Sequence, residues 1–197
     1  DVPERRIPKK QIAKEQKRLN EAVRLARRQI RRLQSRLAAK TDAAAEELGF
    51  LLEAYLHMLK DSRLVRGALQ RIAKKQVNAE AAVKAEVTDI AKVFKTMDDT
   101  YIAARIDDIR EVGNRLLRNL TKTPVKPFSA VPEGSIIVAD QLTPADTAQL
   151  DPELVAGAAA MGGSAEGHTA IMARALGLPT VLGAAGLIGA VRTGDTI

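Results

Sequence analysis

The sequence predicts an all-α unit followed by a small α/β unit, because its two halves follow different hydrophobic patterns. Residues 9–120 carry apolar side chains at the spacing of amphipathic helices, interrupted by short polar breaks. Residues 135–183 instead hold short apolar runs that alternate with one helical run, as in α/β proteins. The segment TKTPVKP, 121–127, contains two prolines and two threonines and marks the boundary between the two patterns.

The first half predicts five helices that form a bundle. Pro8 suits the first turn of the first helix, and Thr41-Asp42 can end it and cap the second. Similar polar breaks that can cap later helices are Asp61-Ser62, Asn78 and Asp98-Asp99. The expected helices are about 9–40, 43–60, 63–75, 79–95 and 100–120. Gly67 and Gly113 lie inside helical patterns and indicate close packing there.

The second half predicts three short, apolar strands and one helix. The expected strands are 135–140, 154–161 and 179–183. The run TAIMARALG, 169–177, has the pattern of a helix that is closed by Gly177 and Pro179. Strands that alternate with short helices predict an α/β unit.

Composition excludes several classes of protein. Because the chain has no Cys, it has no disulfide framework, thiolate metal site or cysteine nucleophile, and a reducing cytoplasm suits it. No apolar run approaches the roughly 20 residues of a membrane span, so we expect no contact with a membrane. Residues 1–40 hold 14 Lys and Arg against 4 Asp and Glu. No aromatic residue interleaves these cations for base stacking, so we expect a solvated basic face and no nucleic-acid partner.

His168, one of two histidines, is the candidate catalytic residue. It lies between a predicted strand and the predicted helix 169–177, behind Gly162, Gly163 and Gly167. Glycines let the backbone approach a bound group, and the start of a helix favours an anion. A neutral imidazole is nucleophilic near pH 7. These features suit a histidine that accepts a phosphoryl group, with a purely structural histidine as the alternative.

Other chemistries match the sequence less well. A metal site needs several ligands, and only His57 is available as a second imidazole, so we expect no metal here. The chain has no G-x-S-x-G motif of a serine hydrolase. The run GGSAEG lacks the G-K-[ST] ending of a Walker P-loop.

The segment GHTAIMARALGLPTVLG, 167–183, resembles the phosphohistidine segment of enzyme I of the bacterial phosphoenolpyruvate-dependent phosphotransferase system. LTPADTAQL, 142–150, is similar to the motif that precedes it in that family. In the first half, LLEAYLHMLKDSRL, 51–64, resembles the segment on which the phosphocarrier protein HPr docks, and residues 101–120 resemble the last bundle helix. Pyruvate phosphate dikinase and phosphoenolpyruvate synthase share the histidine motif but lack the helical insert.

The resemblance implies a swivelling phosphohistidine α/β subdomain, residues 121–197 with 1–8, that carries an inserted helical bundle, residues 9–120. It implies a cytoplasmic phosphotransferase that takes a phosphoryl group from phosphoenolpyruvate onto His168 and passes it to a histidine of HPr during sugar uptake. Phosphoenolpyruvate and Mg²⁺ would bind in a C-terminal barrel beyond residue 197, so residues 1–197 would need no cofactor. We expect these residues to be monomeric and the full-length enzyme to be a homodimer.

The resemblance also assigns roles to individual residues. His168 matches the phosphorylated histidine, Thr147 the threonine whose hydroxyl contacts the imidazole, and Arg174 the arginine of the run HTAIMAR. Gly167 and Thr169 would cradle the phosphate. The residues expected to bind the carrier are Glu46, Glu47, Leu56, Met58, Leu59 and Arg63, although a core face is the alternative for the three apolar ones.

Three features depart from the family pattern. Glu166-Gly167 stand where the family commonly has Thr-Ser, which removes a hydroxyl and adds a carboxylate that can oppose phosphate. Tyr55 stands where many relatives have a histidine. Lys60 and Arg63 occupy positions that are often acidic, so the partner of this chain is expected to be charged differently.

Two other functions stay open. One is enzyme I of the nitrogen-regulatory branch, which feeds a regulatory carrier. The other is a non-catalytic module whose basic first helix binds nucleic acid or an acidic protein, and steeply salt-dependent DNA binding would indicate it.

Overall fold

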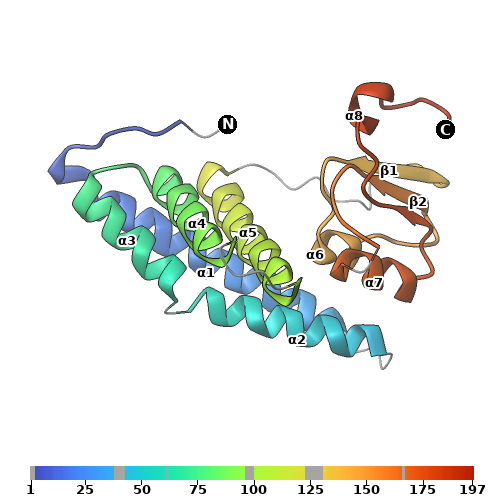
Figure 1. The fold of residues 1–197 in the computed structure, drawn as a ribbon, viewed down its shortest axis with the longest axis horizontal. Helices are drawn as coiled ribbons and strands as arrows, with labels where there is room; N and C mark the ends of the chain where they lie inside the picture. Colours follow the sequence, from blue (N-terminus) through green and yellow to red (C-terminus); the bar gives the residue numbers. More distant parts are fainter. Residues whose placement is uncertain (1–2, 38–42, 61, 96–99, 123–130, 166) are drawn as a thin grey trace. The chain divides into compact units, whose positions relative to one another are not determined.

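The computed structural model describes residues 3–37, 43–60, 62–95, 100–122, 131–165 and 167–197. The chain divides into two compact units, one of Asp1–Ser35 with Leu51–Pro124 and one of Arg36–Phe50 with Val125–Ile197. Helices build the first unit, and a small parallel sheet with short helices builds most of the second (Figure 1). The predicted fold class is therefore confirmed. The domain boundaries stay a prediction, because residues 123–130 lie outside the described part.

Five α-helices follow each other in the described part of residues 1–121, as predicted. They are α1 (Ile12–Leu37), α2 (Ala43–Met58), α3 (Arg63–Lys75), α4 (Ala79–Lys95) and α5 (Thr100–Thr121), and a 3-10 turn, Lys9–Gln11, precedes α1. Ser62 caps α3 as expected, since its side chain accepts a hydrogen bond from the N–H of Val65. The other proposed caps Thr41, Asp42, Asp61, Asp98 and Asp99 lie outside the described residues. None of the helices, over the residues described, combines the length and apolar character of a membrane span.

Aliphatic side chains of different helices meet in the core of the helical unit. Fully buried members include Leu19 and Ile30 of α1, Ile72 of α3 and Leu116 of α5. The close packing expected at Gly113 is present, because a Cβ there would lie 2.5 Å from Val87 Cγ2 of α4. Gly67 of α3 likewise leaves room for the carboxylate of Glu86 on α4.

The start of α4 is held by residues far away in the sequence. Glu15 of α1 accepts a hydrogen bond from the N–H of Ala79 at 2.9 Å. The expected cap, Asn78, instead accepts from the N–H of Arg5 at 2.8 Å. Arg18 of α1 adds an ion pair with Glu80, 2.5 Å between Nη2 and Oε1. The first turn of α4 is thus stabilised by α1 and by the N-terminal segment.

The second unit contains a parallel sheet in the order β1-β2-β3. Its strands are β1 (Ser135–Ala139), β2 (Val155–Ala160) and β3 (Thr180–Val181), which confirms the three predicted strands. The helix α6 (Pro144–Thr147) connects β1 to β2, α7 (His168–Ala175) connects β2 to β3, and α8 (Leu187–Ala190) follows. α6 and α7 pack against each other, as Figure 1 shows. α6 and α8 are additional to the predicted elements.

The end of α7 shows the predicted glycine closure. Gly177 has a φ of 65°, a left-handed conformation that favours glycine after the last turn of a helix. Its N–H donates to the carbonyl of Arg174 at 3.0 Å, and the N–H of Leu178 donates to the carbonyl of Ala173 at 2.9 Å. Leu178 then enters the core of the sheet unit, which is built from Leu142, Leu150, Val155, Ala158, Ala160 and Leu178.

Candidate functional site

The candidate site lies at the edge of the sheet where β1 and β2 end. Because the strands are parallel, the segments that follow β1 and β2 leave the sheet at the same edge, where α/β proteins bind their ligands. The N–H of Gly162 donates to the carbonyl of Asp140 at 2.8 Å and joins the two segments. The first segment leads to Thr147 at the end of α6, and the second leads to His168 at the start of α7.

The beginning of α7 provides free backbone donors. Gly167 is the N-cap, with a φ of −73° and a ψ of 159°, and has no side chain to accept from the first turn. Among the described residues, the backbone N–H groups of His168 and Thr169 find no acceptor. These N–H groups and the dipole of the helix favour an anion at this position.

Thr169 fixes the position of this helix start. Its hydroxyl is buried and donates to the carbonyl of Leu142 at 2.8 Å, in the segment that precedes α6. Because the hydroxyl is engaged in this contact, the backbone N–H is the part of Thr169 that remains for a phosphate. Leu142 contributes through its carbonyl, so its residue type gave no signal in the sequence.

The imidazole of His168 is half-buried, and its ring nitrogens are available for chemistry. In the part of the chain that the structure describes, neither of its nitrogens has a hydrogen bond or an ion pair. A neutral imidazole carries one nitrogen with a free electron pair, which can attack phosphorus without a general base.

Thr147 is buried in the second unit, with 1% of its surface exposed. Its hydroxyl donates to the carbonyl of Thr143 at 3.0 Å, and a capping box between Thr143 and Asp146 holds this short helix. A hydroxyl that donates once can still accept, so Thr147 can receive a hydrogen bond from a ring N–H. A direct contact between Thr147 and His168 is not among the hydrogen bonds of the structure and stays a prediction.

Arg174 reaches back toward the segment that precedes His168. Its Nη2 donates to the carbonyl of Ala165 at 2.6 Å, and the side chain is otherwise exposed. The guanidinium has further donors that can bind a phosphoryl oxygen. Glu166, the departure from the family pattern, lies outside the described residues.

The expected carrier-binding residues of α2 differ in exposure. Glu46 and Glu47 are exposed in its first turns, and Leu56 and Met58 are half-buried near its end. Leu59, just after α2, is fully buried at 0%. A residue of the core cannot offer its side chain to a carrier, so we leave Leu59 out of the carrier surface.

The neighbouring residues add three details. Arg63 is exposed, and its Nε lies 3.7 Å from Oε1 of Glu86. His57 is exposed and pairs with Glu53, one helical turn earlier, at 3.6 Å. Tyr55, where the resemblance implies a histidine in many relatives, is buried and donates to Asp108 Oδ1 at 3.3 Å. Burial, with the charge of Asp108, raises the pKa of Tyr55, so Tyr55 is a neutral core residue.

Metal ligands do not gather at the site. Over the described residues, no group of three or more His, Cys, Asp and Glu side chains is arranged to hold an ion.

Two family models match the chain, one in its helical half and one in its α/β half. The model "PEP-utilising enzyme, N-terminal" matches residues 1–105, and "PEP-utilising enzyme, mobile domain" matches residues 131–197. Fold and family models therefore define the class of protein: the chain combines the helical N-terminal domain and the mobile α/β domain of a PEP-utilising enzyme. Within this class, the chain belongs to the enzyme I family of the phosphoenolpyruvate-dependent phosphotransferase system.

Curated relatives and solved structures support this assignment. The "Phosphoenolpyruvate-dependent phosphotransferase system" protein of Escherichia coli K12 is 38% identical over 87% of this chain and 22% of its own length. The "Phosphoenolpyruvate-protein phosphotransferase" of Bacillus subtilis 168 is 33% identical over 100% of this chain and 35% of its own length. The chain thus spans only about a fifth to a third of these relatives.

Two solved structures show the same architecture. The solution structure of Enzyme I (nEIt) has a TM-score of 0.79 at 29% identity. The match covers 99% of this chain and 77% of the chain in that structure. The structure "N-terminal domain of Enzyme 1 - Nitrogen" has a TM-score of 0.66 at 34% identity. The match covers 93% of this chain and 72% of the chain in that structure.

Proposed function

We propose that this chain is the phosphohistidine-bearing part of a phosphoenolpyruvate–protein phosphotransferase, in which His168 exchanges a phosphoryl group with a histidine of an HPr-type carrier. Phosphoenolpyruvate is the original phosphoryl donor, and sugar uptake in the cytoplasm is the pathway that the reaction serves. One observation carries the proposal: the unoccupied imidazole of His168 begins α7, where the N–H groups of His168 and Thr169 have no acceptor among the described residues.

The transfer is an in-line displacement at phosphorus. The free electron pair of one His168 nitrogen forms the N–P bond, while the bond between phosphorus and the donor's nitrogen or oxygen breaks. The donor keeps the electron pair of the broken bond, and the N–H proton of His168 stays on the other ring nitrogen. Thr147 accepts a hydrogen bond from that N–H and orients the ring.

The remaining groups stabilise the phosphoryl oxygens. The two N–H groups at the start of α7 and the guanidinium of Arg174 donate to them and reduce their negative charge. Gly167 lets the phosphoryl group approach the backbone. Each of these groups is positioned before the reaction, which is the main source of catalysis in phosphoryl transfer.

Two further parts complete the enzyme. The carrier docks on the exposed or half-buried side chains Glu46, Glu47, Leu56, Met58 and Arg63. Phosphoenolpyruvate binds in another domain, where Mg²⁺ supplies charge stabilisation for its phosphate, and that domain also forms the homodimer. The α/β subdomain, residues 121–197, swivels to carry His168 between the two partners. Residues 5–7 stay with the helical unit, because Arg5 and Ile7 are hydrogen-bonded to Asn78 and Gln76.

Phosphoryl transfer from a carrier tests the proposal. Residues 1–197 are mixed with the phosphorylated HPr of Bacillus subtilis or Escherichia coli and weighed by mass spectrometry at neutral pH. We expect one acid-labile phosphoryl group on the parent chain and on His57→Ala, which removes the other histidine, and none on His168→Ala. Phosphoryl gain by His168→Ala, or no gain by the parent from any carrier, contradicts the proposal.

The nitrogen-regulatory branch is the second candidate, because the chain is 34% identical to the "Enzyme 1 - Nitrogen" domain over 93% of its length. Initial rates of transfer from an HPr of the sugar branch and from a carrier of the nitrogen branch separate the two functions. A faster rate with the second carrier assigns the chain to the nitrogen branch.

A further inference from the structure

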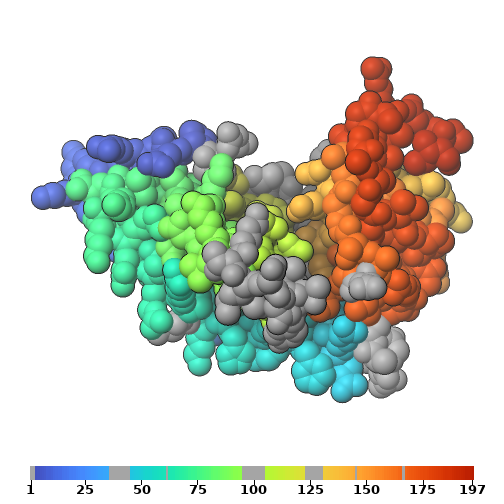
Figure 2. All heavy atoms as spheres, in the orientation of Figure 1, coloured from blue at the N-terminus to red at the C-terminus, as the bar shows by residue number. Residues whose placement is uncertain are grey.

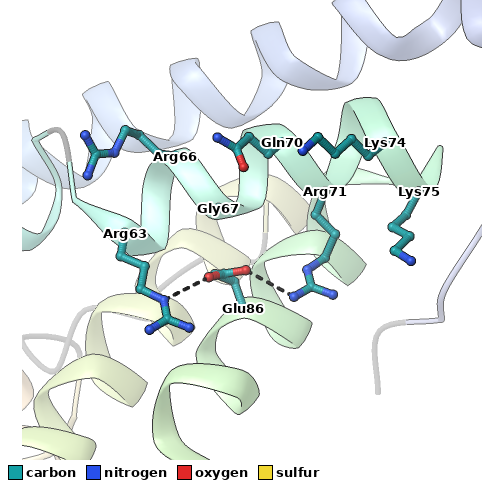
Figure 3. A pocket seen from close by; sticks show the side chains of 8 residues that line it. All are labelled: Arg63, Arg66, Gly67, Gln70, Arg71, Lys74, Lys75 and Glu86. Atoms are coloured by element: carbon teal, nitrogen blue, oxygen red, sulfur yellow. Dashed lines mark hydrogen bonds and ion pairs between the residues drawn. The ribbon is translucent and has the colours of Figure 1, made fainter. Parts of the chain in front are cut away.

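Two arginines of the basic groove on α3 are already engaged within the helical unit. Arg63 Nε lies 3.7 Å and Arg71 Nη2 lies 3.1 Å from the carboxylate of Glu86 on α4 (Figure 3). Arg71 Nη2 also pairs with Asp89 Oδ2 at 2.7 Å. These ion pairs hold α3 against α4. In the α/β unit, the hydroxyl of Ser164 has no comparable partner.

Ser164 lies four residues before His168, in the segment that leads from β2 into α7. Its side chain is exposed, and the segment around α7 forms part of the surface in Figure 2, where it is orange. The hydroxyl of Ser164 has no hydrogen bond with any residue that the structure describes. Since a hydroxyl can donate one hydrogen bond and accept two, this side chain is available to a ligand.

A tight turn brings Ser164 against Gly167, the N-cap of α7. The N–H of Gly167 donates to the carbonyl of Ser164 at 3.2 Å, three residues earlier. A Cβ added to Gly167 would lie 3.4 Å from Ser164 Oγ. The hydroxyl of Ser164 therefore borders the space that the absent side chain of Gly167 leaves. This space lies at the end of α7 where the N–H groups of His168 and Thr169 are free.

The turn that carries Ser164 is fastened to α7. Arg174 Nη2 donates to the carbonyl of Ala165, the residue after Ser164, at 2.6 Å. Gly163, the residue before Ser164, has a φ of 98°, which favours glycine. The proposed phosphate-binding guanidinium of Arg174 thus contacts the turn of Ser164. A donor on an anchored turn is positioned before a phosphoryl group arrives, which is what electrostatic catalysis requires.

The resemblance to the enzyme I family shows why a hydroxyl at this place matters. Its pattern commonly has a serine immediately before the phosphorylated histidine, and this chain has Gly167 there. The hydroxyl of that serine is therefore missing. Ser164 brings another hydroxyl to the border of the same space, from three residues earlier in the chain.

We propose that the hydroxyl of Ser164 donates a hydrogen bond to an oxygen of the phosphoryl group on His168, in place of the serine that Gly167 replaces. No covalent bond of Ser164 forms or breaks, and its proton stays on Oγ. The N–P bond forms at His168 as described above. This role rests on the proposed function, because it requires a phosphoryl group on His168.

Initial rates of transfer from phosphorylated HPr to residues 1–197 test this role, with Ser164→Ala as the variant. We expect Ser164→Ala to slow transfer about ten-fold, because a hydrogen bond to a charged group is lost. The matched control is Ser135→Ala, which removes a hydroxyl that donates to the carbonyl of Pro132 elsewhere in the same unit. This control should change the rate at most about two-fold.

Rescue separates a lost hydroxyl from a disturbed turn. The double variant Ser164→Ala/Gly167→Ser returns a hydroxyl to the same space and should recover most of the rate. The ³¹P resonance of the phosphohistidine should shift in Ser164→Ala and move back in the double variant, because a hydrogen bond to a phosphoryl oxygen changes its shielding.

Three outcomes would overturn the role of Ser164. Equal rates and an unshifted ³¹P resonance in a folded Ser164→Ala would show that its hydroxyl does not touch the phosphoryl group. A double variant as slow as Ser164→Ala would show that the turn, and not the hydroxyl, is needed. No transfer to the parent chain would overturn this role together with the proposed function, whereas the first two outcomes leave the phosphorylation of His168 standing.

Discussion

Gly167 carries no side chain where relatives of this family commonly have serine, but its backbone is ordinary. The φ of −73° and ψ of 159° suit any N-cap residue. A Cβ added there would lie 3.4 Å from both the carbonyl and the hydroxyl oxygen of Ser164, which a small side chain tolerates. The backbone conformation therefore does not require glycine at this position.

We predict that Gly167→Ser leaves the fold intact and raises the free energy of unfolding by about 0.3 kcal/mol. The reason is that serine caps a helix slightly better than glycine. Transfer to His168 should be equal or faster, because the hydroxyl can donate to a phosphoryl oxygen. Urea denaturation and the mass-spectrometric transfer measure both effects. The control Gly163→Ser, at a φ of 98°, should instead destabilise by about 1 kcal/mol or more. Loss of transfer in a folded Gly167→Ser would show that phosphate needs the empty space.

Glu80 stabilises the start of α4 while it is ionised. Burial alone would raise the pKa of Glu80, but the hydrogen bonds and charge of Arg18, together with a hydrogen bond from Asn78, outweigh burial and lower the pKa. The unfolded chain then binds a proton more readily than the folded one. This stabilisation is complete above the unfolded pKa of about 4.3 and is lost as pH falls through the lower folded pKa.

We predict that Glu80→Gln lowers the free energy of unfolding at pH 7 by about 2 kcal/mol, because charged hydrogen bonds in a buried setting are lost. The decline of stability in acid should also become shallower. Urea denaturation at several pH values between about 3 and 7 measures both. Glu53→Gln, on the exposed pair with His57, is the control and should change stability little. An unchanged acid profile for Glu80→Gln would disprove the role of this carboxylate.

At the scale of elements, the packing of α4 on α5 depends on the missing side chain of Gly113. We predict that Gly113→Ala destabilises the helical unit by about 1–3 kcal/mol, because the new methyl group overlaps Val87. The control is Gly49→Ala in α2, where a Cβ meets nothing within 4 Å. This change should stabilise by about 0.5–1 kcal/mol through helix propensity alone. Urea denaturation followed by far-UV circular dichroism measures the free energy of unfolding of both variants. A change of the same sign in both variants would contradict the packing role of Gly113.

The periodic elements were predictable from the sequence, and the contacts between them were not. The spacing of apolar residues indicates each of the five helices, and Gly177 marks the end of α7, because these signals are local. The partner of the Ala79 N–H is Glu15, 64 residues away, and the start of α7 is fixed by the carbonyl of Leu142. Such partners depend on the tertiary fold. α6 has only four residues, too few to show a helical period.

At the scale of the whole molecule, the sequence placed the histidine correctly on the edge of an α/β unit but could not show how the chain divides. Residues 36–50, the end of α1 and the first half of α2, group with residues 125–197 by their contacts, although their sequence pattern continues that of the bundle. A division of this kind depends on contacts between segments that are distant in the sequence. The spacing of apolar residues does not reveal such contacts. Leu59 shows the same limit, since the helical pattern left its burial open.

Donor specificity is the property that belongs to the molecule as a whole. The matched family models are the N-terminal and mobile domains, and the chain spans 22% and 35% of the length of two curated relatives. We therefore predict that a sample of residues 1–197 gains a phosphoryl group from a phosphorylated carrier but not from phosphoenolpyruvate with Mg²⁺, because His168 needs a donor held in line with its nitrogen. Mass spectrometry at neutral pH after each incubation measures both. Phosphorylation of the purified sample by phosphoenolpyruvate alone, absent in His168→Ala, would show that these residues bind the donor themselves, and the site at the start of α7 would then have to hold the phosphate of phosphoenolpyruvate directly.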